Sequence, residues 1–246
     1  MRFAPIWIAV PLCWTAVVQA EPLADLRARL AQLQGQDAIS ATLEATQNVR
    51  KDATVQAVTG HATLALQAGA QGLQLTFPPE LLQQAQRETQ ARVKNPELPT
   101  PTNDLLRDAT ALEIGKLLRY SDSLMHALDG ATLKESRADT FDGKPAQLLV
   151  LDVPGHMSVK DKEDLKHFQA QLKVWLDADG APLASEETYN FSGRKFLIGF
   201  EGSESVSARF AIVGARLVAL LRTSHATFSG FGQDNDTSTT TTLSLK

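Results

Sequence analysis

The chain has 246 residues, with 24 Lys and Arg against 28 Asp and Glu and a net charge of −4. An acidic balance argues against nucleic-acid binding, which depends on clustered basic side chains. Cys13 is the one cysteine and lies in the N-terminal leader, so the rest of the chain has no disulfide, thiolate nucleophile or cysteine metal ligand.

The first 20 residues have the pattern of a secretory signal peptide. A basic Arg2 precedes an apolar stretch, which ends in the small residue Ala20 before the first acidic residue, Glu21. We expect cleavage between Ala20 and Glu21, export to the periplasm or beyond, and no transmembrane span after cleavage. The alternatives are a retained membrane anchor and a lipidated Cys13, and the bulky Leu12 before that cysteine disfavours lipidation.

Residues 22–35 predict a leading amphipathic helix. Leucines recur at spacings of three and four, Pro22 suits a first turn and Gly35 suits a C-cap. We expect the leucine stripe to pack on the core of the same domain, with partner or membrane binding as the alternative.

Apolar and polar residues then alternate over 39–46, 62–67 and 73–77, the period of half-buried strands. The connections are short and turn-like, which predicts an antiparallel meander. Pro78 and Pro79 end the third strand. Helix formers over 79–93 and about 103–128 predict an insertion at about 79–128 that folds over the sheet, with an independent helical domain as the alternative.

The remainder returns to strands. Asp142-Gly143 is a hairpin signal, and 168–176 is the clearest alternation, with Phe168, Leu172 and Val174 on its inward side. Ser192-Gly193 predicts a turn into a strand through Phe196, Ile198 and Phe200, whereas the charged segment 158–167 has some helical character. We therefore predict, for 21–246, a single α+β domain that is mostly antiparallel β. Its curved sheet or half-barrel has about nine or ten strands, with a leading helix and a helical insertion covering one face.

The sequence resembles the periplasmic half-barrel family of lipoprotein carriers and receptors, the LolA/LolB family. The resemblance lies in residues 26–30 of the leading helix, in the strand 72–78 that runs into prolines, and in 173–177 followed by the Asp179-Gly180 turn. It implies a curved sheet whose apolar concave face, covered by helices, holds acyl chains as ligands.

Such a cavity would work by burying CH₂ groups, at about 0.8 kcal/mol each. Small inward residues such as Ala45 and Ala62 favour a cavity, and the alternative is an ordinary filled core. The candidate cavity walls are Ile39, Ala41, Leu43, Leu64, Leu66, Leu73, Leu75 and Phe77.

No catalytic, metal or cofactor motif stands out. The five histidines are isolated in sequence, and the Asp-rich segments 177–180 and 234–236 are better interpreted as turns than as calcium loops. We therefore expect a non-enzymatic binding or carrier protein for lipid or another apolar ligand, without a cofactor. The alternatives are an interaction or scaffolding module that binds a protein partner of the cell envelope, and an outer-membrane β-barrel.

Overall fold

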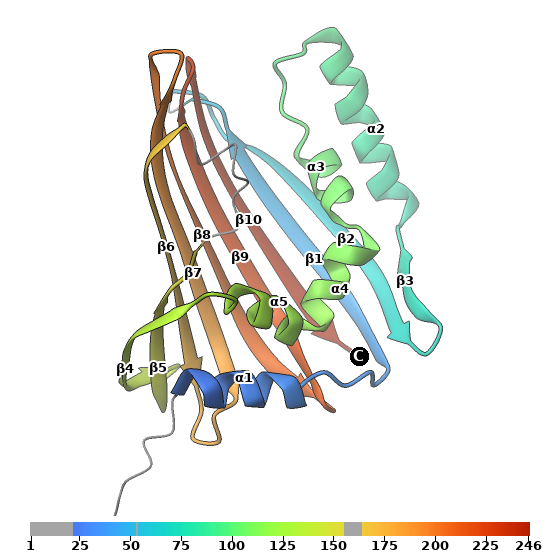
Figure 1. Ribbon diagram of the computed structural model, residues 1–246. Coiled ribbons are helices and arrows are strands. Elements are labelled where there is room, and N and C mark those ends of the chain that lie inside the picture. Colours follow the sequence, from blue (N-terminus) through green and yellow to red (C-terminus); the bar gives the residue numbers. More distant parts are fainter. Residues whose placement is uncertain (1–21, 53, 155–163) are drawn as a thin grey trace, which may run out of the picture.

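The computed structural model describes residues 22–52, 54–154 and 164–246, and Figure 1 shows their arrangement. The expected cleavage site at Ala20 and Glu21 and most of the charged segment 158–167 lie outside these residues. The described part of the chain folds into one ten-stranded antiparallel sheet and five helices. None of those helices is long and apolar enough to cross a membrane.

The sheet is built from two meanders joined by the pairing of the first and last strands. The order is β3-β2-β1-β10-β9-β8-β7-β6-β5-β4, so β3 and β4 are free edges and the sheet does not close. The strands are β1 (Ile39–Arg50), β2 (Val58–Gly69), β3 (Gly72–Thr76), β4 (Thr132–Phe141), β5 (Lys144–Asp152), β6 (Leu165–Leu176), β7 (Pro182–Lys195), β8 (Ile198–Val213), β9 (Arg216–Gly230) and β10 (Gln233–Leu245).

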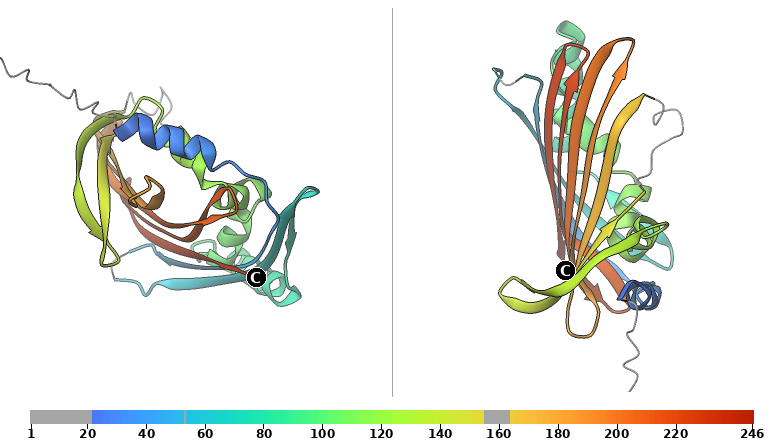
Figure 2. Two further views of the ribbon diagram at one scale, coloured as in Figure 1. Left: turned by 90° about the horizontal axis from the view of Figure 1, so that it is seen from below. Right: turned by 60° about the vertical axis from the view of Figure 1, so that its left-hand side comes forward.

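The helices lie on one face of this curved sheet. They are α1 (Pro22–Gln32), α2 (Pro79–Lys94), α3 (Pro101–Asp108), α4 (Ala111–Leu118) and α5 (Tyr120–Ala127). Figure 2 shows the sheet bent around them, with α1 lying across one end. The predicted α+β fold, with an antiparallel curved sheet, a leading helix and a helical insertion covering one face, is confirmed.

Helix α1 buries Leu26 and Leu30, as its leucine stripe predicts, and Leu33 is buried directly after the helix. The prediction for Gly35 is wrong, because α1 ends at Gln32 and Gly35 lies beyond it. Gly35 instead donates its N–H to the Ala215 carbonyl at 2.7 Å, and a Cβ there would lie 2.7 Å from the Ala215 Cβ. Glycine is needed at this position because the chain passes directly against the turn between β8 and β9.

The helical stretch predicted over about 103–128 is broken into three short helices. The first break lies between α3 and α4. After it, Thr110 caps α4, because its hydroxyl oxygen accepts a hydrogen bond from the N–H of Glu113 at 3.2 Å. Arg119, with φ −138°, separates α4 from α5. The breaks let the chain change direction as it crosses the concave face, which a straight helix could not do.

Two apolar clusters fill the space between the sheet and the helices. The first lies between β1–β3 and α2–α4, and the second between β5–β6 and the pair α1 and α5. Tyr120 and Phe210 contact both clusters, with ring centroids 4.8 Å apart. The inward positions predicted on β6, including Leu172 and Val174, are buried in the second cluster.

The hairpin between β7 and β8 differs from the prediction. Strand β7 continues through Ser192 and Gly193 to Lys195, and the turn is made by Phe196 and Leu197 at φ 48° and 71°. Gly193 pairs with Phe200, and a Cβ on Gly193 would lie 2.5 Å from the Phe200 ring. The glycine therefore makes room for a cross-strand aromatic ring. At the Asp142-Gly143 hairpin, by contrast, both residues have positive φ, as predicted.

Glu88 on α2 holds the start of α3. Its carboxylate accepts hydrogen bonds from the N–H groups of Thr102 at 3.0 Å and Asn103 at 3.2 Å, so it supplies the cap that α3 lacks locally.

We expect Glu88→Ala to lower the free energy of unfolding by about 1 kcal/mol. Urea unfolding followed by circular dichroism would measure this change, and Glu88→Gln, which keeps an acceptor oxygen, should lose less. Equal stability of Glu88→Ala and the parent would contradict the capping role.

Candidate functional site

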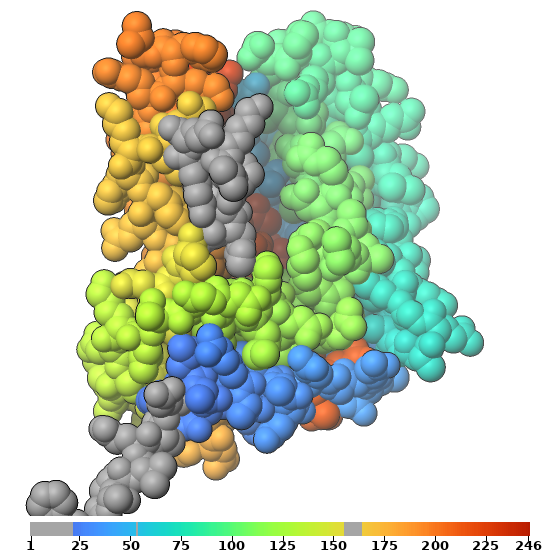
Figure 3. Space-filling view, in the orientation of Figure 1, coloured from blue at the N-terminus to red at the C-terminus, as the bar shows by residue number. Residues whose placement is uncertain are grey.

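A large hollow lies between the concave face of the sheet and helices α3–α5. Its volume is about 1120 Å³. Strands β6–β8 form one wall and the helices the other, and Figure 3 shows the sheet at the back of the hollow between them. Ligand pockets are about 300–1,000 Å³ in most proteins, so this cavity is large enough for a ligand of lipid size.

The two ends of the cavity differ in polarity. Leu43 and Leu64 on β1 and β2 face Leu105, Ile114 and Leu117 on the helices, which makes one end apolar. Directly beside them, Ala45 and Ala62 form a cross-strand pair that also lines the cavity. Two methyl side chains at this pair leave open the volume that larger residues would fill.

Polar side chains cover the floor on β7–β10. Glu187 and Tyr189 come from β7, Arg222 and Ser224 from β9, and Thr241 from β10. Residues paired directly across neighbouring strands point to the same face of a sheet. Glu187 pairs with the buried Leu172, and Thr241 pairs with Arg222, so these side chains lie on the concave face. The apolar end therefore continues into a polar floor within one cavity.

The two tyrosines of the cavity are neutral hydrogen-bonding groups. Burial raises the pKa of Tyr120, and Arg222 and Ser185, which bond to its hydroxyl, oppose part of that rise. Burial also raises the pKa of Tyr189, and its hydrogen bond to the Glu187 carboxylate adds to the effect. Both phenols thus keep their protons at neutral pH and remain able to donate hydrogen bonds.

Arg222 is the cation of this floor. Among the described residues no carboxylate lies within 4.0 Å of its guanidinium, although Tyr120 bonds to it. It is only half-buried, so water can solvate it in the empty cavity. Glu187 and Glu204 line the same floor, so a ligand with a polar group would find both donors and acceptors there while its apolar part lay against Leu43 and Leu64.

All eight candidate cavity residues belong to the apolar cluster under α2–α4 or pack against it. Those buried in it are Ile39, Ala41, Leu43, Leu64 and Leu66, and those that pack against it are Leu73, Leu75 and Phe77. Leu43 and Leu64 also line the cavity.

Sequence reasoning missed the cavity floor on β7–β9. The alternation of side chains along a strand could have revealed it, because residues two apart point to the same face. Glu187 and Tyr189 lie two and four residues after the buried Ser185, and Arg222 and Ser224 are also two residues apart. Polar residues in the inward phase of a strand indicate a lined cavity rather than a filled core.

A second hollow, of about 500 Å³, lies at the end of the sheet near the β7–β8 and β9–β10 turns. Beside it Asp236 pairs with both Arg50 and His225, the latter at 2.8 Å. Hydrogen bonds from Arg50 and His225 lower the pKa of Asp236, so its carboxylate is ionised and belongs to an ion-pair network. His225 thus has a partner on the neighbouring strand that sequence spacing did not reveal.

Within the described ranges, no three His, Cys, Asp or Glu side chains converge to hold a metal ion.

Comparison with known proteins gives no relative from which a function could be taken. No family model matches the sequence, and searches of curated proteins and of solved structures found no match. The functional argument therefore rests on the cavity itself.

Proposed function

We propose that the protein is an exported, non-enzymatic binding or carrier protein whose cavity takes an amphipathic lipid or a similar apolar ligand. The observation that carries the proposal is the cavity of about 1120 Å³ on the concave face, apolar at the β1–β2 end and polar on its β7–β10 floor. Export to the periplasm or beyond is inferred from the leader sequence.

The layout of the cavity suits a ligand with one apolar and one polar part. Each CH₂ group placed among Leu43, Leu64 and Ile114 would contribute about 0.8 kcal/mol, so a chain of ten carbons would contribute about 8 kcal/mol before the entropic cost of binding. Arg222 and the hydroxyl of Tyr120 lie at the polar floor, where they would orient the head of such a ligand.

The resemblance to the LolA/LolB carriers supports the same proposal. That family's half-barrel has an apolar concave face under helices, and here an open curved sheet carries helices on one face. A lipoprotein or its acyl chains would be the corresponding cargo. The cavity is compatible with that cargo and equally with a free amphiphile.

An interaction module of the cell envelope has less support. Strand addition needs an accessible sheet edge, and edge strand β4 carries Lys134, Glu135, Arg137 and Asp139, a charge pattern that protects edges from pairing. The other edge, β3, is only five residues long.

The direct test is lipid analysis of protein purified from the periplasm without detergent. Native mass spectrometry should show an added mass of lipid size, and extraction of the same sample should yield a stoichiometric lipid. If the purified protein is free of ligand, it should still bind 11-(dansylamino)undecanoic acid, with a rise in dansyl fluorescence. Absence of both results would overturn the proposal.

A blocking substitution links binding to the cavity. Ala62→Trp places an indole where the Ala45–Ala62 pair leaves space, so we expect at least a tenfold weaker affinity for the dansyl probe, since an apolar group of this size removes contacts worth more than about 1.4 kcal/mol. Ala65→Trp is the matched control, because Ala65 lies on the same strand with its side chain exposed on the other face. Equal affinities of the two variants would show that the probe binds elsewhere.

A further inference from the structure

We propose that the turn between β7 and β8 docks the protein on a lipid bilayer. Phe196 and Leu197 form this turn and are 87% and 84% exposed, and the next residue, Ile198, is 48% exposed. Three consecutive large apolar side chains at the end of a long hairpin are a feature of membrane-contacting loops, because they meet the acyl region first when the hairpin points at a bilayer.

The stability of the hairpin does not explain why apolar residues occupy this turn. Hairpin turns whose two central residues have positive φ favour Asn and Gly, which adopt that conformation at low cost. Phe196 and Leu197 adopt it at φ 48° and 71°, and neither packs into the apolar clusters of the described structure. Apolar side chains therefore occupy the two positions where local stability would favour other residues.

Aromatic residues support the turn from behind. Phe231, in the neighbouring β9–β10 turn, is 44% exposed and stacks on Phe200 at 5.9 Å between ring centroids. Phe200 in turn stacks on Phe228 at 6.4 Å. Phe200, Phe228 and Phe231 thus form one aromatic group behind the turn.

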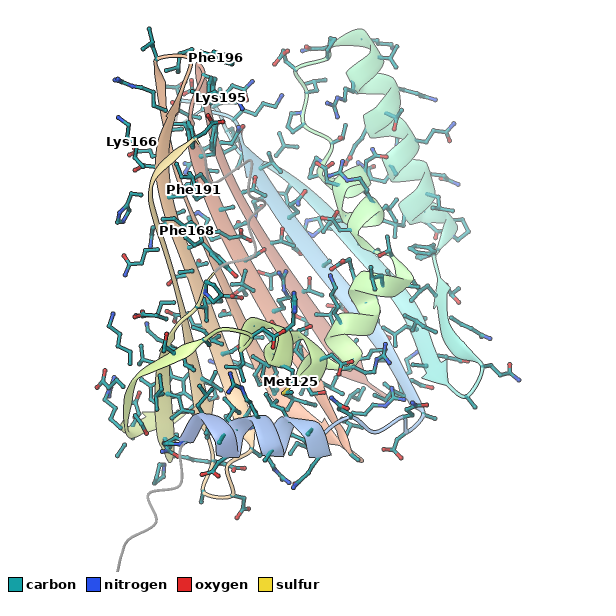
Figure 4. All side chains as sticks on the ribbon, viewed as in Figure 1. Met125, Lys166, Phe168, Phe191, Lys195 and Phe196 are labelled. Atoms are coloured by element: carbon teal, nitrogen blue, oxygen red, sulfur yellow. The ribbon has the colours of Figure 1, made fainter. Side chains whose placement is uncertain are left out.

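The charges around this end are of both signs. Arg194 and Lys195 immediately precede the turn, and Lys166 lies on the adjacent strand β6; Figure 4 labels Lys195 next to Phe196. Asp164 pairs with Lys195 at 2.9 Å, and the exposed Glu201 and Asp234 at the same end of the sheet balance the exposed Arg194 and Lys166. The apolar side chains of the turn, and not a net charge, therefore provide the contact with lipid.

The docked orientation would also place the cavity near the membrane. Figure 4 shows Phe168 and Phe191 on the strands between the turn and Met125 of α5, and both phenylalanines line the cavity. An apolar path from the bilayer to the cavity floor would therefore follow β6 and β7. This connection rests on the proposed carrier function, whereas docking itself does not.

The test uses the purified protein and vesicles of phosphatidylcholine with or without one quarter phosphatidylglycerol. We expect co-sedimentation with both kinds of vesicle, and we expect it to fall about tenfold or more in the double variant Phe196→Ser/Leu197→Ser, because two apolar side chains lose their contact with lipid. Leu112→Ser is the control: it removes a side chain that is 70% exposed on α4, and it should bind vesicles like the parent.

A fluorescent reporter gives an independent readout. In Phe196→Trp we expect vesicles to shift the added tryptophan emission to the blue and brominated lipids to quench it, with the parent as background. Failure of the parent to bind either vesicle, or binding by the double variant equal to the parent, would overturn the proposal. So would a vesicle-independent dimer that the double variant abolishes, because the turn would then contact a second copy. Dansyl-probe binding without vesicles tests the carrier function separately.

Discussion

Leu172→Ala is expected to lower the free energy of unfolding by about 2–5 kcal/mol, the range for deleting a fully buried leucine. Leu172 lies at the centre of β6 with 1% of its side chain exposed. It belongs to the cluster that α1 and α5 cover, and its direct cross-strand partners are Leu151 on β5 and Glu187 on β7. Neighbours fixed on both sides by strand pairing cannot collapse into the space that the leucine leaves.

Urea unfolding followed through Trp175 fluorescence would measure the change. Leu112→Ala is the control, because Leu112 is 70% exposed and its loss should alter stability by no more than about 0.5 kcal/mol. A change below about 1 kcal/mol for Leu172→Ala would contradict tight packing of this cluster.

Local alternation predicted strands most clearly where one face of the strand is buried. On β2 and β6 the burial alternates residue by residue, so the sequence records which side faces the core. The pairing of β1 with β10 is different: Leu43 meets Leu243 across almost the whole chain. No local pattern encodes that pairing, so the sheet order and the position of the cavity could not be derived from the sequence.

The wrong prediction at the β7–β8 turn and the breaks within the confirmed helical insertion have a common physical origin. Gly193 looks like a turn residue in isolation, yet its lack of a side chain serves the Phe200 ring on the next strand. The helix formers over 103–128 do form helices, and the curved surface beneath them decides where these break. In both places a tertiary contact overrides a correct local preference.

The candidate site was only partly visible for the same reason. Leu43 and Leu64 border the cavity as well as the packed cluster, whereas Ile39, Ala41 and Leu66, with the same sequence pattern, belong to the packed cluster alone. The difference lies in what the insertion places above each residue. The polar floor around Arg222 required the register of β7–β10 before its members could be seen as neighbours.

Gly60→Ala is expected to move α3 off the sheet and so to weaken both stability and ligand binding. A Cβ on Gly60 would lie 2.6 Å from the backbone carbon of Pro101 and from the nitrogen of Thr102, at the start of α3. These are backbone atoms, so no side-chain rotation can relieve the clash. Overpacking of this kind costs about 1–3 kcal/mol, and displacement of α3 would also move Leu105, which lines the cavity.

Gly69→Ala provides the comparison, because it makes the same substitution on the same strand. A Cβ there would lie 3.8 Å from the Ala38 Cβ, an ordinary contact, so this variant should be as stable as the parent or slightly more stable. Urea unfolding and dansyl-probe titration of both variants separate the two effects. Loss of stability in Gly60→Ala with unchanged probe affinity would mean that α3 is not a functional wall of the cavity. Loss of both, with Gly69→Ala unaffected, would show that the close contact between β2 and α3 determines the shape of the binding site.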